Sequence, residues 1–368
     1  MGACGSKEIT GSKRSRDPSR WKAEDTTNEV SDALSRERES QAPSSELTMN
    51  AVVAYFDAGG SSDETTTDKC LTGWEDGTVQ MQDWRRKATL STSKLHSRAV
   101  NRIVTGTKTR SVITCSRDTT VVMTRKWAVD QTESQPIVMS GHSLNVSTIA
   151  LDDDETTVCS GGRDTQTILW DLTTAQSKSK NTTAQNVITC SKWVPRERVI
   201  AQGSEDLSVK LWDEKNGLRA PVQALRGYVY FPLCLDISSD GLYIVTSSKG
   251  FNGVGCEVRV WDRRTGRQLI QYEGHQQDAT ACCFLDPKLP NSSQEAEKFP
   301  VVASASKDGT VKIWDVTSTQ VLSEAHEPSG GMFTSISWAG GVLLAGTLHG
   351  VVHAVEVDAI TSMLKLVE

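Results

Sequence analysis

The sequence predicts an all-β fold, a seven-bladed β-propeller that follows an N-terminal tail. Two observations support this prediction. A twelve-residue pattern that often ends in Trp-Asp recurs along most of the chain of 368 residues. The segments between its copies are short apolar runs separated by turn residues, which is typical of all-β proteins. We therefore expect the tail over residues 1–48 and the propeller over residues 49–368.

The tail is rich in Ser, Thr, Glu, Arg and Lys and has few large apolar side chains. Such a segment buries too little surface to offset the entropy of ordering, so we expect it to be disordered. Its first half is basic and its second half is mostly acidic. The basic residues are Lys7, Lys13, Arg14, Arg16, Arg20 and Lys22.

The first seven residues, MGACGSK, fit the Met-Gly-x-x-x-Ser pattern of N-myristoylation on Gly2. One myristoyl chain binds a membrane only weakly, and a palmitoyl group on Cys4 would supply a second anchor. The basic residues that follow would attract anionic lipid. The stretch also resembles the dually acylated starts of flagellar calcium-binding proteins. These features predict a cytoplasmic protein on the cytosolic face of a membrane, held there by acyl chains.

Seven copies of the pattern follow the tail, and the clearest is SASKDGTVKIWD. They occupy residues 72–83, 114–125, 160–171, 202–213, 256–262, 304–315 and 345–356. The positions equivalent to Trp314 are 82, 124, 170, 212, 261, 314 and 355, and their spacing runs from 41 (355 − 314) to 53 residues (314 − 261). A repeat of roughly 40–45 residues is the period of four-stranded propeller blades.

Each copy has the local chemistry of a β-hairpin. Asp308 and Gly309 supply the backbone angles of a tight turn, and Val311 and Ile313 alternate with polar or aromatic neighbours along the next strand. Blade one has its own first strand near residues 51–56, and residues 362–367 supply a last outer strand. We therefore expect the ring to close without an exchange of strands between the termini.

The copies resemble WD40 repeats. Residues 186–213 and the stretch KGFNGVGCEVRVWD (249–262) resemble the WD repeat-containing protein 31 family over all seven blades. That resemblance implies a non-enzymatic role in ciliary membrane traffic, with small-GTPase regulators or ciliary trafficking proteins as partners on one propeller face. It implies localisation to a cilium or flagellum, and we expect a monomeric propeller.

Copies three and six both contain His, Ser, Asp and Trp, in this order and at equivalent positions of the repeat. The two sets are His142, Ser160, Asp164 and Trp170, and His275, Ser304, Asp308 and Trp314. Either set could be taken for a hydrolase triad. The resemblance instead implies a buried hydrogen-bond network, and two copies in separate blades favour this structural interpretation. Blade two has Thr124 in place of Trp, and blade four has Gln202 in place of Ser. We expect no enzyme activity and no cofactor.

Two insertions interrupt the repeats. The first, residues 247–257, holds three glycines without a phosphate-binding pattern. It lies where WD40 proteins commonly bind partners, so Phe251, Asn252 and Glu257 are the candidate partner-binding residues. The alternative, a Phe251 side chain folded back onto the blade, is left open. The second insertion, residues 286–300, is expected to be a solvated loop.

Composition limits the remaining classes of function. The net charge of −6 and a pI near 5.7 argue against a nucleic-acid partner. The nine cysteines are scattered without metal-ligand spacing, so no metal site is predicted and the thiols are expected to be reduced in a cytosolic or nuclear chain. No apolar run approaches the length that spans a bilayer.

One alternative function rests on the turn Trp261-Asp262-Arg263-Arg264. Substrate receptors of cullin-RING ubiquitin ligases resemble one another in a Trp-Asp-x-Arg signature, commonly on two neighbouring blades. This chain matches it once, because the equivalent stretches at 212–215 and 314–317 lack the Arg.

Overall fold

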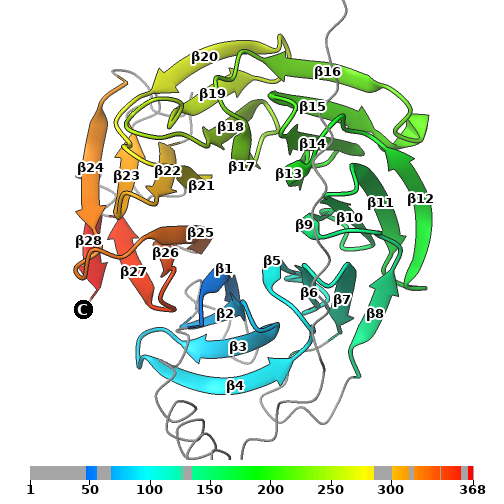
Figure 1. Ribbon diagram of the computed structural model, residues 1–368, viewed down its shortest axis with the longest axis horizontal. Helices are drawn as coiled ribbons and strands as arrows, with labels where there is room; N and C mark the ends of the chain where they lie inside the picture. The colour runs from blue at the N-terminus through cyan, green and yellow to red at the C-terminus, as the bar shows by residue number, and fades with distance from the viewer. Residues whose placement is uncertain are drawn as a thin grey trace, which may run out of the picture. The chain divides into compact units, whose positions relative to one another are not determined.

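The structure is a computed structural model that describes residues 47–55, 68–125, 127, 135–285, 301–314, 319–339, 341–357 and 364–367. Within these residues the chain folds into seven four-stranded antiparallel sheets. The sheets are arranged radially around a central channel as the blades of a propeller (Figure 1). The predicted fold class is therefore confirmed. Residues 1–46, which hold nearly all of the expected tail, lie outside the described residues.

Each of the first four blades takes four consecutive strands. Blade one has β1 (Met49–Tyr55), β2 (Lys69–Trp74), β3 (Thr78–Asp83) and β4 (Ala88–Lys94). Blade two has β5 (Val100–Thr105), β6 (Val112–Ser116), β7 (Thr120–Thr124) and β8 (Ile137–Ser140). Blade three has β9 (Val146–Leu151), β10 (Thr157–Gly162), β11 (Gln166–Asp171) and β12 (Gln176–Thr182). Blade four has β13 (Ile188–Trp193), β14 (Val199–Ser204), β15 (Ser208–Asp213) and β16 (Pro221–Arg226), with the 3-10 turn η1 (Glu214–Asn216) after β15.

The last three blades follow the same order. Blade five has β17 (Pro232–Ile237), β18 (Tyr243–Ser248), β19 (Val258–Asp262) and β20 (Arg267–Tyr272). Blade six has β21 (Ala279–Leu285), β22 (Val301–Ser306), β23 (Thr310–Trp314) and β24 (Val321–His326). Blade seven has β25 (Phe333–Ala339), β26 (Val342–Thr347), β27 (Val352–Val357) and β28 (Leu364–Val367). The first strand of each blade lines the channel and the fourth lies at the rim (Figure 1).

The ring closes without strand exchange, as predicted. β1 pairs with β2 of its own blade, and the outer strand β28 pairs with β27. Blades one and seven meet through side-chain contacts and packing: the Val52 N–H donates to Ser335 Oγ over 3.3 Å, and Thr334 Oγ1 donates to the Met49 carbonyl over 3.1 Å. The first and last blades are therefore held together by contacts similar to those between other blades.

The apolar core lies between neighbouring sheets, because radial packing covers both faces of each blade. On β23 the predicted alternation is present: Val311 and Ile313 pack toward blade seven, whereas Trp314 packs toward blade five. The turn before this strand ends at Gly309, whose φ of +79° is in the left-handed region that favours glycine. The repeat thus encodes both the turn and the two faces of the strand.

Candidate functional site

The network of blade three joins four residues from different elements. Trp170 Nε1, on β11, donates to Ser160 Oγ, on β10, over 2.8 Å. The Ser160 hydroxyl lies 2.7 Å from His142 Nε2, and His142 Nδ1 lies 2.9 Å from Asp164 Oδ2 in the turn between β10 and β11. The network therefore ties this turn to the loop that enters the blade.

These hydrogen bonds suit a neutral histidine. His142 Nδ1 donates to the Asp164 carboxylate, and in a neutral ring Nε2 then accepts from the Ser160 hydroxyl, which itself accepts from Trp170. Burial lowers the pKa of His142, which agrees with a neutral ring. The same directions occur in a hydrolase triad. Ser160 and Ser304, however, are both 0% exposed, so no substrate reaches either hydroxyl.

Blade six repeats the network. Trp314 Nε1 donates to Ser304 Oγ over 2.8 Å, and His275 Nε2 lies 2.8 Å from the same oxygen. His275 Nδ1 lies 3.1 Å from Asp308 Oδ2. Asp308 also accepts the backbone N–H of Gln276 over 2.9 Å and two hydrogen bonds from Thr310, so it organises the whole turn.

Blade two contains the same network without its tryptophan. His96 Nε2 lies 2.8 Å from Thr114 Oγ1, and His96 Nδ1 lies 3.0 Å from Asp118. At the position of the missing ring, the Thr124 hydroxyl is buried and has no hydrogen-bond partner. Burying an unpaired polar group costs free energy, so the hydrogen bonding of blade two is less complete than that of blades three and six.

Blade five has an equivalent network that the sequence did not predict. Trp261 Nε1 donates to Thr246 Oγ1 over 3.1 Å, and the Tyr228 hydroxyl lies 3.1 Å from the same oxygen. Tyr228 follows Gly227 as His follows Gly in the intact copies. The Arg259 guanidinium lies 5.1 Å from the Tyr228 ring. The Gly-Tyr pair was the available signal, but the insertion in this blade hid the alignment.

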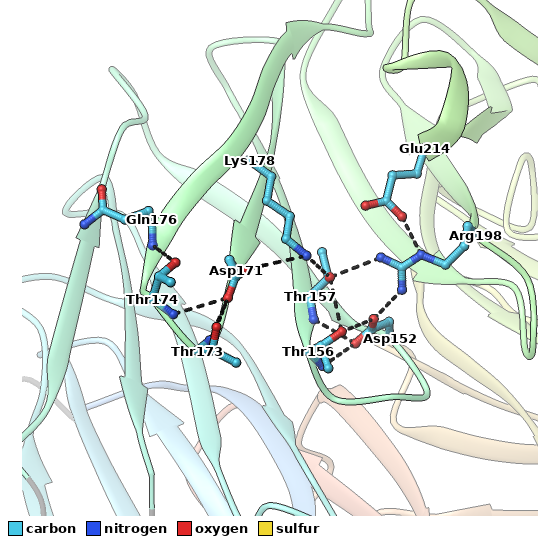
Figure 2. A network of polar contacts seen from close by, with 10 residues as sticks. All are labelled: Asp152, Thr156, Thr157, Asp171, Thr173, Thr174, Gln176, Lys178, Arg198 and Glu214. Atoms are coloured by element: carbon cyan, nitrogen blue, oxygen red, sulfur yellow. Dashed lines mark hydrogen bonds and ion pairs between the residues drawn. The ribbon is translucent and has the colours of Figure 1, made fainter.

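A second polar network joins blades three and four on the face that carries the hairpin turns between first and second strands. Arg198, just before β14, donates to Asp152 of blade three and to Glu214 of η1 (Figure 2). It also donates to Thr157 Oγ1 over 3.1 Å, and its guanidinium lies 4.8 Å from the Trp193 ring. Hydrogen bonding to Glu214 raises the pKa of Arg198. Arg198 is therefore an inter-blade tie.

The opposite face carries the loop of the first insertion. Strands alternate in direction, so the loop between the second and third strands lies on the same face as the entry to each blade. Gly250 N–H donates to Asp278 Oδ1 over 3.1 Å, and Phe251 and Val254 exchange backbone hydrogen bonds of 2.9 and 3.0 Å. Asn252 has a φ of +50° at the tip. The loop is thus a fixed projection attached to blade six.

The structure decides how the three candidate residues of this loop are presented. Phe251 is 62% exposed, so its ring is not folded back onto the blade. Asn252, beside it, is also exposed. Glu257 differs from them: its side chain is only 12% exposed, and its carboxylate lies 3.9 Å from Arg259. Glu257 is therefore poorly placed to meet a partner that contacts Phe251.

Exposed apolar side chains gather around this loop and form what we call the blade-five cluster. Its members come from the loop before β17 and the loop between β18 and β19. They are Val229, Tyr230, Phe251 and Val254, and each is at least 41% exposed. The Tyr230 ring covers Gly255 so closely that a Cβ there would overlap it. The cluster is thus partly held together by direct contact.

The channel opens on the same face through a cavity of about 490 Å³. Its charged lining comprises Arg102, Arg117, Arg163, Lys307, Glu205 and Asp278, which gives four positive and two negative groups. Lys307 pairs with Asp278 over 2.8 Å. The mouth therefore carries excess positive charge, 4 − 2 = +2, in a chain whose net charge is −6.

The Trp-Asp-x-Arg turn lies on the face opposite the blade-five cluster, because it joins β19 to β20. Asp262 Oδ1 accepts the backbone N–H groups of Arg264 and Thr265 over 2.8 and 3.2 Å. Arg263 pairs with Glu197 over 2.7 Å. The Arg264 side chain is exposed at the end of the turn.

Several predictions concern residues that the structure does not describe or features that it lacks. Gly2 and Cys4 lie outside the described residues, so their acylation stays a prediction. The insertion over 286–300 also lies outside them, so its expected solvated loop stays a prediction as well. Among the described residues, no group of three or more His, Cys, Asp or Glu side chains is placed to hold a metal ion. In the same part of the chain, no helix has the length and apolar character needed to cross a membrane.

Comparison with known families identifies the repeat. Three segments, residues 134–171, 177–213 and 266–315, match the family model described as "WD domain, G-beta repeat". They correspond to parts of blades two, three, four, five and six. The expected resemblance to WD40 repeats is confirmed, whereas the finer likeness to the WD repeat-containing protein 31 family is not among these findings.

The chain is also similar to several curated proteins. It is 24% identical to a periodic tryptophan protein 2 homolog of Dictyostelium discoideum, over 61% of this chain and 23% of that protein. It is 25% identical to protein HIR1 of Cryptococcus neoformans, over 59% and 26%. It is 27% identical to a U3 snoRNP-associated protein-like protein of Arabidopsis thaliana, over 48% and 29%. The match spans only about a quarter of the length of these relatives.

These relatives contradict the expected location. The tail predicted a cytoplasmic protein on the cytosolic face of a membrane, in a cilium or flagellum. The similar proteins are instead of nuclear or nucleolar type. The prediction was wrong because it rested on a short N-terminal pattern, whereas the comparison rests on the repeats that make up most of the chain.

Proposed function

Because the chain carries WD40 repeats on a seven-bladed propeller, we propose that it is a non-catalytic scaffold that binds a protein partner through the blade-five cluster. The single observation that carries this proposal is the Phe251 loop. It presents an aromatic side chain that is 62% exposed from a backbone fixed by hydrogen bonds to a neighbouring blade. Rigid aromatic side chains are the residues that most often dominate the energy of protein interfaces.

The cluster has the composition of an interface core rather than of ordinary surface. Phe251, Val254, Val229 and Tyr230 are contributed by adjoining loops on one face. Single exposed apolar residues are common on soluble proteins, but a contiguous group of them marks an interaction site. The positive channel mouth on the same face would give such a partner an electrostatic orientation.

The proposal is tested by purifying partners with the full chain and two variants. Burying one Phe side chain contributes roughly 2 kcal/mol, so Phe251→Ala should weaken binding about thirtyfold. The control is Leu242→Ala on the opposite face, which removes an apolar side chain of comparable exposure, 47%. Partners should be lost with Phe251→Ala and kept with Leu242→Ala. Equal recovery with both variants would contradict the proposal.

A second candidate, the substrate receptor of a cullin-RING ubiquitin ligase, is supported by the exposure of Arg264 at the end of its turn. This function would use the face opposite Phe251. It is tested by co-purification of the ligase adaptor with the full chain: Arg264→Ala should abolish it, while Phe251→Ala should leave it unchanged. Membrane traffic is not part of either proposal, because the relatives do not support a membrane location.

A further inference from the structure

Four thiols line the central channel on consecutive inner strands. They are Cys190 on β13, Cys234 on β17, and Cys282 and Cys283 on β21. The cavity that they border has a volume of about 440 Å³ and is also lined by Arg102, Lys192 and Asp236. Thiols in a polar, solvent-sized cavity differ from thiols packed inside a blade, because small solutes can reach them.

Two of these thiols lie against each other across a blade boundary. The Cys234 thiol donates to the Cys282 carbonyl oxygen over 3.7 Å, and the two side chains pack in the same apolar cluster between blades five and six. Cys234 is half-buried and Cys282 is 4% exposed. Cys234 is therefore the more exposed member of the pair, and both residues border the channel cavity.

A positive charge lies near Cys234. Arg102 of blade two reaches across the channel, where its guanidinium donates to the Leu233 carbonyl over 3.4 Å. Interaction with the Cys282 side chain, and then the charge of Arg102, lower the pKa of Cys234 below its usual range despite burial. The neighbouring Asp236 carboxylate is paired with Lys192 over 3.0 Å, which offsets its negative charge.

The cysteines inside the blades provide the contrast. Cys115 and Cys159 are both 0% exposed. Burial raises the pKa of Cys115 to about 12 and raises that of Cys159 still further. These thiols stay protonated and unreactive, whereas the arrangement around Cys234 favours the thiolate, which is the nucleophilic form.

We propose that Cys234 and Cys282 are a dithiol that reacts with hydroperoxides and closes to a disulfide between blades five and six. The Cys234 thiolate attacks the terminal peroxide oxygen, the O–O bond breaks and Cys234–SOH forms. The leaving alkoxide, or hydroxide when the peroxide is H2O2, takes up the proton that the Cys234 thiol released and departs as an alcohol or water. The Cys282 thiol then attacks the sulfenic sulfur, an S–S bond forms and water leaves. The two thiols lose two electrons, and the peroxide gains them.

The test uses the reduced full chain treated with H2O2 and then digested after blocking of the remaining thiols. Mass spectrometry should find the peptides of Cys234 and Cys282 joined, with Cys115 and Cys159 unmodified. This measurement on the unaltered protein needs no variant. Absence of the joined peptides at a peroxide concentration that leaves the protein folded would overturn the proposal, as would joining of Cys282 to another partner.

Variants separate the two steps. In Cys282→Ser the sulfenic acid on Cys234 has no partner, so dimedone should label Cys234. In Cys234→Ser neither the disulfide nor the label should form. Arg102→Gln should slow the oxidation of Cys234 several-fold, because the thiolate loses its nearest positive charge. Dimedone labelling of Cys283 in place of Cys234 would assign the reactive thiol elsewhere and contradict the proposal.

Discussion

The hydrogen-bond network of blade six should contribute several kilocalories per mole to stability, and Asp308 is the residue on which this is best measured. Its carboxylate accepts from His275, from the Gln276 backbone and twice from Thr310. Replacement by alanine removes the carboxylate from all of these donors, although His275 Nδ1 keeps a contact of 3.1 Å with Thr310 Oγ1. His275 is 1% exposed and Thr310 is 6% exposed, so water does not readily replace it.

The magnitude follows from the number of buried donors. Each buried donor left unsatisfied costs about 1–3 kcal/mol. Two buried residues lose their partner, and water entering the vacated space relieves part of the cost. We therefore expect Asp308→Ala to lower the free energy of unfolding by about 3 kcal/mol, and Asp308→Asn, which keeps one acceptor oxygen, to lower it less.

The assay is urea denaturation followed by tryptophan fluorescence. Variants are compared when the unfolding free energy depends on urea concentration with the same slope. Asp171→Ala is the matched control. Asp171 accepts hydrogen bonds from Thr173 and Thr174 in a tight turn (Figure 2), but its side chain is more exposed, at 28%, than that of Asp308, at 9%. Its replacement should therefore have a much smaller effect. A loss below about 1 kcal/mol for Asp308→Ala, or an equal loss for both variants, would refute the reasoning.

The same carboxylate predicts an acid dependence. Hydrogen bonds from His275 and Thr310 hold the pKa of Asp308 well below its ordinary value, despite burial. A group whose pKa is depressed by folding stabilises the protein above its unfolded pKa and loses that contribution as the pH falls toward its folded pKa. Stability should thus decline below about pH 4 through this residue, and Asp308→Ala should show a flatter decline.

Three further predictions concern other positions of the blades. Thr124→Val replaces a buried hydroxyl that lacks a partner with a methyl group, so it should raise the free energy of unfolding by up to about 1 kcal/mol, and a lower urea midpoint would contradict this. Arg198→Ala leaves Asp152 and Glu214 without their shared cation. Thermal melting should show that the free energy of unfolding falls by about 2 kcal/mol, and that this loss is smaller in high salt. Burial lowers the pKa of His96 and His142, so the unfolded chain takes up protons at a higher pH than the folded protein. The free energy of unfolding should therefore fall as the pH drops below about 6.5. Urea midpoints that rise as the pH is lowered from 7.5 to 5.5 would contradict this prediction.

The repeat allowed most of the fold to be predicted, because each blade encodes the same local physics. The tryptophan positions at 170, 212, 261 and 314 all lie on the third strands of their blades. The closing strand β28 was also predicted from alternation over only six residues. Turn chemistry and a two-residue period act locally, so they can be recognised without knowledge of the rest of the structure.

The candidate binding surface could be predicted only in part. The loop that carries Phe251 is visible as a glycine-rich insertion, but its partners in the cluster are not. Val229 and Tyr230 lie in an ordinary-length connection, and their exposure depends on how blades four and five meet. The Tyr228 network was missed because a tyrosine hydroxyl fills a place that the repeat pattern assigns to histidine, and because the insertion in this blade hid the alignment.

The most direct test of the binding face is site-specific photocrosslinking in cells. A photoreactive phenylalanine analogue placed at Phe251 should form a covalent link to the same protein that co-purifies with the full chain. The analogue placed at Leu242, exposed on the opposite face, should not. A link to that protein from Leu242 and none from Phe251 would contradict the assignment of the blade-five cluster as the binding surface.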